Sequence, residues 1–119
     1  MNDSSEGDDG ADQLVAWGRV IRVATRGRNS GRTQLATIGF VEEPDGSLLV
    51  AAGDPDADWA LNLLETPRCR VTLAARSFVA TAEPLIEDEH NRAVRALVLR
   101  YGTPSERLGL GPSFRLRPL

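Results

Sequence analysis

The 119-residue sequence has little cysteine and no long apolar run. Its single cysteine, Cys69, excludes an internal disulfide and fits a reducing compartment. The longest apolar stretches, residues 47–53 and 96–99, fall far short of the roughly 20 residues of a membrane-spanning helix. The first residues lack the positive charge and the apolar core of a secretory signal. These absences predict a cytoplasmic protein without a membrane span.

Lysine is absent as well, since all 14 basic residues are arginine. Arginine binds phosphate and carboxylate groups in a two-point geometry better than lysine does. The net charge of -3 conceals an acidic beginning, because residues 1–13 hold five acidic and no basic residues, whereas the remainder holds 12 acidic and 14 basic ones. One histidine and one cysteine far apart do not make a metal site, so no metal is expected.

Length and composition indicate one domain, because a chain of 119 residues can bury one hydrophobic core but not two. Residues 1–13 are mostly Ser, Gly and Asp, which predicts a disordered acidic tail ahead of a domain over residues 14–119. Apolar and β-branched patterns predict six strands: 19–25, 33–41, 47–52, 68–75, 78–86 and 113–118. Helical spacing appears at 59–65 and 87–101. Turns such as Glu42–Gly46 indicate hairpins, so the expected fold is mainly β (α+β), a small antiparallel barrel with two helices.

Five arginines between positions 19 and 32 form the first candidate site. No acidic residue interrupts them, and Gly27-Arg-Asn-Ser-Gly31 breaks the strand pattern among them. Backbone N–H groups, a hydroxyl and guanidinium groups at such a turn can converge on an anion. The spacing is neither that of a Walker loop nor that of a dinucleotide fingerprint. A phosphate or carboxylate cradle and a solvated charged turn both fit this pattern.

The second candidate site combines Ala51-Ala-Gly53 with Asp58, Trp59 and Asn62. Small residues at a strand end let a flat ring approach the backbone, so that N–H groups can bond ring oxygens while a nearby helix closes one side. The alternative is structural, with Trp59 as a core anchor and Asn62 as a tie between helix and loop.

Together the two sites resemble the deazaflavin-dependent nitroreductases. In that family an apolar strand ends in Thr and continues into a Gly-Arg-Lys-Ser-Gly turn, which Val23-Ala-Thr-Arg-Gly-Arg-Asn-Ser-Gly-Arg32 resembles. The stretches Leu49-Val-Ala-Ala-Gly53, Asp58-Trp-Ala-Leu-Asn-Leu63 and Thr66-Pro67 resemble its second signature. Order and spacing agree from Val20 to the C-terminus.

The resemblance implies a split β-barrel, related to the flavin-binding pyridoxamine-phosphate-oxidase barrels, that binds the deazaflavin coenzyme F420. It implies an oxidoreductase that transfers hydride between F420 and a small unsaturated molecule, such as a quinone, an enone or a nitroaromatic. Because the cofactor carries the hydride, the protein need only position the substrate and polarise it. The residues that match the motifs would contact the phosphate and tail (Arg28, Asn29, Ser30, Gly31 and Arg32), the ring (Ala51, Ala52 and Gly53) or its surroundings (Trp59 and Asn62).

Several positions depart from the family pattern. The resemblance also implies an N-terminal helix that covers the substrate side. This chain is expected to lack most of that helix. The changes at positions 29, 34 and 54 remove positive charge or add negative charge, so the tail is expected to bind less tightly or to move onto Arg19, Arg22 and Arg26. The departures are Asn29 for a usual lysine, Gln34 for a common arginine, Thr37-Ile38 for Pro-Leu, and Asp54 for lysine or glycine.

Tyr101, the only tyrosine, is the candidate catalytic residue, because a reduced product needs a proton donor. His90 is the rival donor, and a packing or surface role is the alternative for each. Two further functions stay open: an FMN-binding relative, and a cofactor-free descendant that binds a small molecule or assists a biosynthetic pathway. A nucleic-acid partner is not expected, since the basic cluster is too local for a phosphate track. A homodimer is expected by analogy alone.

Overall fold

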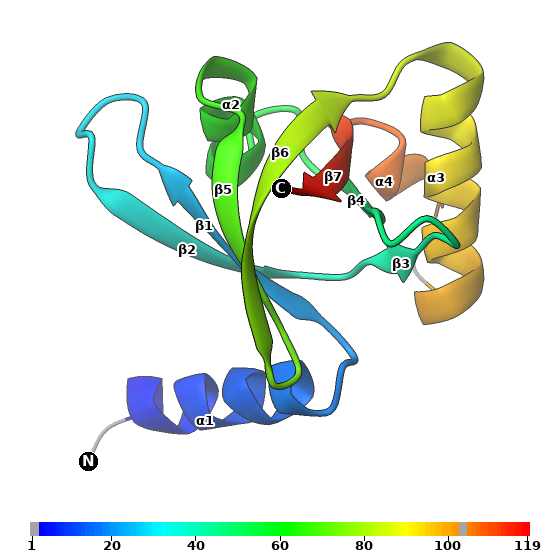
Figure 1. Ribbon diagram of the computed structural model, residues 1–119. Coiled ribbons are helices and arrows are strands. Elements are labelled where there is room, and N and C mark those ends of the chain that lie inside the picture. Colours follow the sequence, from blue (N-terminus) through cyan, green and yellow to red (C-terminus); the bar gives the residue numbers. More distant parts are fainter. Residues whose placement is uncertain (1–2, 103–104) are drawn as a thin grey trace.

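Seven strands form one antiparallel sheet that curls into a half-barrel in the part of the chain described, residues 3–102 and 105–119 of a computed structural model (Figure 1). Their order across the sheet is β2-β1-β5-β6-β7-β4-β3. Neighbours in sequence pair as hairpins at each edge and in the middle of the sheet. The strands are β1 (Ile21–Arg26), β2 (Thr33–Ile38), β3 (Val41–Glu42), β4 (Leu48–Ala51), β5 (Arg68–Leu73), β6 (Arg76–Pro84) and β7 (Ser113–Pro118).

The helices cover three sides of this sheet (Figure 1). Helix α1 (Asp3–Ala16) lies at the end where β5 turns into β6, and α2 (Asp58–Glu65) lies at the opposite end. Helix α3 (Glu87–Tyr101) runs along β3, β4 and β7, with the single turn α4 (Ser105–Leu108) beside it. No helix in the described ranges is long and apolar enough to cross a membrane.

The main core lies on the concave side of the sheet, where strand residues alternate between buried and less buried positions. In β1 the pattern places Ile21, Val23 and Thr25 inside. Helix α2 closes this core with Ala60 and Leu63, both almost fully buried. A smaller cluster lies under α3 and consists of Leu49, Leu85 and Ala93. The concave core therefore fixes α2 against β1 and β2, where the candidate site lies.

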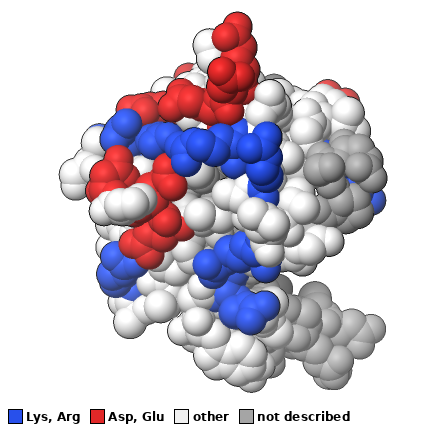
Figure 2. All heavy atoms as spheres, turned by 90° about the vertical axis from the view of Figure 1, so that its right-hand side faces the viewer, with Lys and Arg blue, Asp and Glu red and all other residues white. Residues whose placement is uncertain are grey.

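Ion pairs fasten α3 to the sheet. Arg115 of β7 is 8% exposed, and its Nη2 lies 3.6 Å from Glu89 of α3 and 3.8 Å from Glu43. Arg92 of α3 reaches the same Glu43 carboxylate at 3.0 Å. Figure 2 shows basic and acidic side chains in contact across this face. Charge on the α3 side of the molecule is therefore largely matched within the chain.

The expected antiparallel split β-barrel is confirmed, but the prediction of one strand over 33–41 is wrong. The stretch breaks at Gly39 and Phe40, so β2 pairs with β1, and only β3 continues through the turn into β4. A Cβ on Gly39 would lie 2.8 Å from Cε2 of Tyr101, and the N–H of Phe40 donates to the Tyr101 hydroxyl at 3.0 Å. The close approach of α3 at this point thus separates β2 from β3 and gives seven strands instead of six.

The structure also differs from the predicted disordered tail, of which residues 1–2 lie outside the described part. Helix α1 spans Asp3–Ala16, and the carbonyl of Val15 accepts a hydrogen bond from Ala74 at 3.0 Å. Asp12 forms an ion pair with Arg22 at 2.6 Å. Burial of Val15 and these two contacts offset the entropic cost of ordering the end of the helix. Helix α1 lines neither hollow described below, so the expectation that this chain lacks most of the helix over the substrate side stays a prediction.

Candidate functional site

The arginine-bearing turn, residues 27–32, is shaped by its own hydrogen bonds. The N–H of Gly31 donates to the carbonyl of Gly27 at 2.8 Å, and the N–H of Arg32 donates to Oγ of Ser30 at 3.1 Å. Gly31 has φ +74°, which favours glycine, and a Cβ on Gly27 would lie 2.8 Å from Ser30 Oγ. Both glycines are therefore required by the turn. Four of its residues remain exposed: Asn29, Ser30, Gly31 and Arg32.

Arg28 is the exception, because it folds back onto α2. Its backbone N–H and its Nη1 both donate to Oδ1 of Asn62, at 3.1 and 2.9 Å. Its Nη2 lies 3.2 Å from Oδ1 of Asp58, the first residue of α2. The charge of Arg28 is thus already balanced by the carboxylate of Asp58. The side chain of Asp58 is 75% exposed.

Asn62 joins three segments at one buried point. Besides accepting from Arg28, it donates through Nδ2 to Oγ1 of Thr25 at 3.0 Å and to Oε1 of Gln34 at 2.6 Å. Its exposure is 0%, so the side chain presents no atom to a ligand in this structure. The amide ties β1, the turn and β2 to α2. This geometry matches the structural alternative considered for Asn62.

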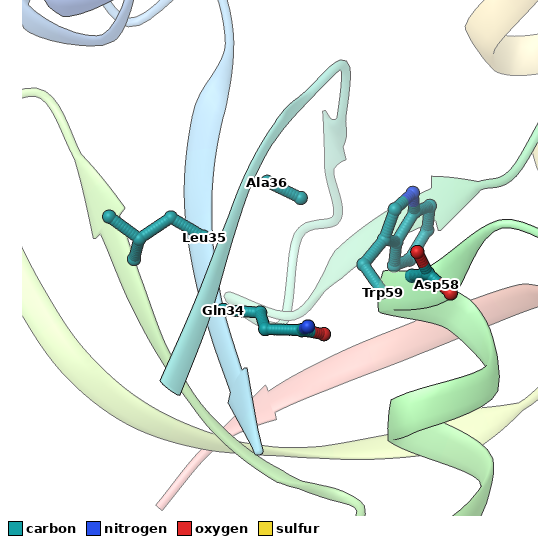
Figure 3. A pocket seen from close by; sticks show the side chains of 5 residues that line it. All are labelled: Gln34, Leu35, Ala36, Asp58 and Trp59. Atoms are coloured by element: carbon teal, nitrogen blue, oxygen red, sulfur yellow. The ribbon is translucent and has the colours of Figure 1, made fainter. Parts of the chain in front are cut away.

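A hollow of about 480 Å³ lies between β2 and the start of α2, and we call it the strand-helix hollow. Figure 3 shows the Gln34 amide reaching from β2 toward α2, with the Trp59 and Asp58 side chains at the start of α2. Trp59 is half-buried and also packs on Phe114, with ring centroids 6.1 Å apart. Trp59 is therefore both a core anchor and a wall of the hollow, whose lining residues are Gln34, Leu35, Ala36, Asp58 and Trp59.

A second, smaller hollow of about 180 Å³, the inner hollow, lies under the C-terminal half of α3. Of the predicted ring-binding segment, Ala51 lines it, whereas Ala52 is 1% exposed and its N–H donates to the Pro112 carbonyl at 2.8 Å. That N–H is therefore not available to a ring oxygen. Gly53 is half-buried. The lining is mostly apolar: Val20, Gly39, Ala51, Leu97, Tyr101 and Leu108.

The two predicted motifs do not line one hollow among the described residues. The turn reaches the strand-helix hollow through the contact of Arg28 with Asp58, whereas Ala51 lines the inner hollow. Strand β2 connects them, since its residue Ala36 lines the first hollow and Gly39, just beyond its end, lines the second. At about 3.3 Å per residue these two positions are about 10 Å apart. The two hollows are thus lined by residues three positions apart, one in β2 and one just beyond its end.

Neither predicted proton donor has a free polar group at these hollows. The Tyr101 ring lines the inner hollow, but its hydroxyl lies 2.6 Å from the carbonyl of Arg19 and accepts from the N–H of Phe40. His90 Nδ1 lies 2.6 Å from Oγ of Ser113 and lines neither hollow. In this structure both side chains serve as ties between elements.

Sequence reasoning missed the contacts of two polar residues of the site. Gln34 drew attention only as a departure from arginine, yet its amide is a partner of the central Asn62. Asp58 was noted beside Trp59, but its pairing with Arg28 was not foreseen. Both contacts join residues 28 or more positions apart, so no local pattern signals them.

Comparisons with known proteins agree with this architecture. The chain is similar to the solved structure of an F420-H2 dependent reductase (FDR-A), at 21% identity and a TM-score of 0.70 over 83% of this chain and 94% of that one. It is similar to HutZ, the heme storage protein from Vibrio cholerae, at 20% identity and a TM-score of 0.65 over 100% and 92%. It is also similar to the conserved hypothetical protein Rv2991 from Mycobacterium tuberculosis, at 20% identity and a TM-score of 0.68 over 99% of this chain and 81% of that one. At these identities the likeness establishes the fold.

No curated protein matches the chain. A family model does, and it covers residues 3–107, which include the turn, the strand-helix hollow and both ends of β2. The chain therefore belongs to the F420H(2)-dependent quinone reductase family.

Proposed function

We propose that this protein binds coenzyme F420 and transfers hydride between it and a small unsaturated molecule of the quinone, enone or nitroaromatic type. The observation that supports this most is the strand-helix hollow, walled by Trp59 and Gln34 beside the arginine-bearing turn, in a chain of the F420H(2)-dependent quinone reductase family.

The residues present fit such a group. A volume of about 480 Å³ lies in the range of roughly 300–1,000 Å³ that holds small ligands. Trp59 offers a flat apolar wall, and exposed Arg32 and Ser30 offer donors for an anionic tail. The apolar inner hollow suits an uncharged unsaturated substrate. When bound, F420 supplies the hydride, and these residues orient the two partners.

One observation favours a second candidate, the cofactor-free descendant. Arg28 is already paired with Asp58, and Asn29 adds no positive charge to the turn. On that reading the pair stabilises the turn and the hollow binds a small molecule without redox chemistry. An FMN-binding relative would instead use Arg32 and Ser30 for one phosphate.

The two tryptophans allow a direct test, because only Trp59 lines the hollow and Trp17 is 69% exposed at the end of α1. Trp17→Phe leaves Trp59 as the sole tryptophan, and Trp59→Phe is the matched control that leaves Trp17. Each variant is titrated with oxidised F420, reduced F420 and FMN while tryptophan emission is followed. We expect saturable quenching by F420 in Trp17→Phe and little in Trp59→Phe.

Turnover is then measured as oxidation of reduced F420 by a quinone, an enone and a nitroaromatic. Saturable binding with turnover supports the proposal. Binding of FMN in place of F420 overturns it in favour of the FMN-binding relative. If neither cofactor binds, while both variants stay folded by circular dichroism, the cofactor-free function is the correct one.

A further inference from the structure

We infer that the outer face of the sheet carries a second anion-binding site, lined by Arg26, Arg68 and Arg70 and suited to a small phosphate-bearing molecule. The site is separate from the strand-helix hollow and does not rest on the proposed function. It lies where β1, β5 and β6 present their outward side chains.

A hollow of about 370 Å³, the outer-face hollow, marks this site. Three of its lining residues are arginines, and no carboxylate is among them. Ala24 and Val79 supply a small apolar floor and Thr33 a hydroxyl group at the rim. The full lining is Ala24, Thr25, Arg26, Thr33, Arg68, Cys69, Arg70 and Val79.

Strand register explains why the arginines gather. Ala24 of β1 faces Arg70 of β5, and Arg70 faces Val79 of β6. The β1–β5 ladder ends at the Ala24–Arg70 pair, and Arg26 and Arg68 lie two positions beyond it on their strands. Residues two apart share a face of the sheet, so all three guanidinium groups project to the same side. Three positive charges gathered on one face repel one another.

No ion pair among the side chains that the structure describes compensates this charge. None of the three arginines has a carboxylate within ion-pair distance among those side chains, whereas Arg92, Arg115 and Arg117 are paired with Glu43, Glu83 or Glu89. All three arginines are exposed, and Nη2 of Arg26 lies beside Gly31 of the arginine-bearing turn. A bound anion would remove the repulsion and satisfy the guanidinium donors.

Phosphate is the chemistry that this arrangement recognises best. Guanidinium groups bind phosphate oxygens through pairs of parallel hydrogen bonds, and three converging arginines can neutralise a dianion. The volume exceeds that of a bare ion, and the apolar floor of Ala24 and Val79 accommodates a carbon skeleton. Three arginines in one hollow are too few for an extended nucleic-acid track.

The test uses inorganic phosphate and pyrophosphate as probes, in a phosphate-free buffer, by calorimetric titration of the full chain. The variants are Arg70→Gln and the double Arg68→Gln/Arg70→Gln. The matched control is Arg95→Gln, which changes an exposed α3 arginine outside the hollow and outside every ion pair among the described side chains. We expect pyrophosphate to bind the wild type, at least tenfold weaker binding in the double variant, and no change in the control.

Removal of mutually repelling charges should leave the melting temperature of the double variant unchanged or slightly raised, which separates loss of the site from loss of folding. F420 titration of the same variant should be unaffected, so failure of this site is distinguishable from failure of the proposed function. Equal pyrophosphate binding by wild type and double variant overturns the inference. So does the absence of binding to the wild type, or a short single-stranded oligonucleotide that binds more tightly than pyrophosphate.

Discussion

Replacement of Asn62 by alanine should be among the most destabilising single changes in this protein. The amide is fully buried and takes part in four hydrogen bonds, two as donor to Thr25 and Gln34 and two as acceptor from Arg28. Alanine removes all four and leaves the backbone N–H of Arg28 and the hydroxyl of Thr25 without this partner.

The magnitude follows from these partners. A typical intramolecular hydrogen bond contributes about 0.5–1.5 kcal/mol, and a buried polar group left unsatisfied costs about 1–3 kcal/mol. The Thr25 hydroxyl is 2% exposed and bears the larger cost, whereas Gln34 is exposed and can turn to water. Together these effects give a loss of about 3 kcal/mol, a large share of the roughly 5–15 kcal/mol that stabilises a domain.

Urea unfolding followed by circular dichroism measures this loss. Asn91→Ala is the matched control, because Asn91 is an exposed asparagine of α3, and we expect its free energy of unfolding to change by less than about 0.5 kcal/mol. Hydrogen exchange should also accelerate at the N–H of Arg28 in Asn62→Ala. A loss below about 1 kcal/mol would refute the assignment of Asn62 as the tie between α2, β1 and the turn.

Two further predictions concern Tyr101 and Cys69. Tyr101→Phe leaves the N–H of buried Phe40 without its partner, so thermal unfolding should show a loss of about 1–2 kcal/mol in the free energy of unfolding. We expect kcat to stay within about twofold of the wild-type value. A tenfold fall in kcat at unchanged stability would instead identify Tyr101 as the proton donor. Burial raises the pKa of the Cys69 thiol from 9.0 to about 11. Since the unfolded thiol ionises first, stability should fall as pH rises from 9 toward 11, by about 2–3 kcal/mol in total, and Cys69→Ala should show none of this dependence in unfolding titrations.

Much of the fold could be predicted because it depends on local patterns. Helix α3 and strand β7 have the expected bounds, since apolar spacing and the glycine at position 102 define them within the segment itself. The break between β2 and β3 could not be predicted in this way. It depends on the ring of Tyr101, about sixty positions away in sequence, which leaves room for nothing larger than glycine at position 39.

The candidate site was predicted less completely, because sequence motifs do not show which side chains are already paired. The turn at 27–32 was correctly located, and its glycines are required by its geometry. That Arg28 points back onto α2 depends on Asp58 and Asn62, whose positions follow from the packing of α2 against β1. Contact of the motif residues with a cofactor stays a prediction.

The two partners of Arg28 have different consequences for ligand binding. Its pair with Asp58 is mostly solvated on the carboxylate side, and such exposed pairs contribute only about 0–1 kcal/mol. A phosphate or a tail carboxylate of a ligand can therefore displace Asp58 at little cost. The bond from the backbone N–H of Arg28 to buried Asn62 does not depend on Asp58 or on the position of the guanidinium. The backbone of the turn is thus held in place while the guanidinium remains exchangeable, so the observed ion pair does not block an anion from the turn.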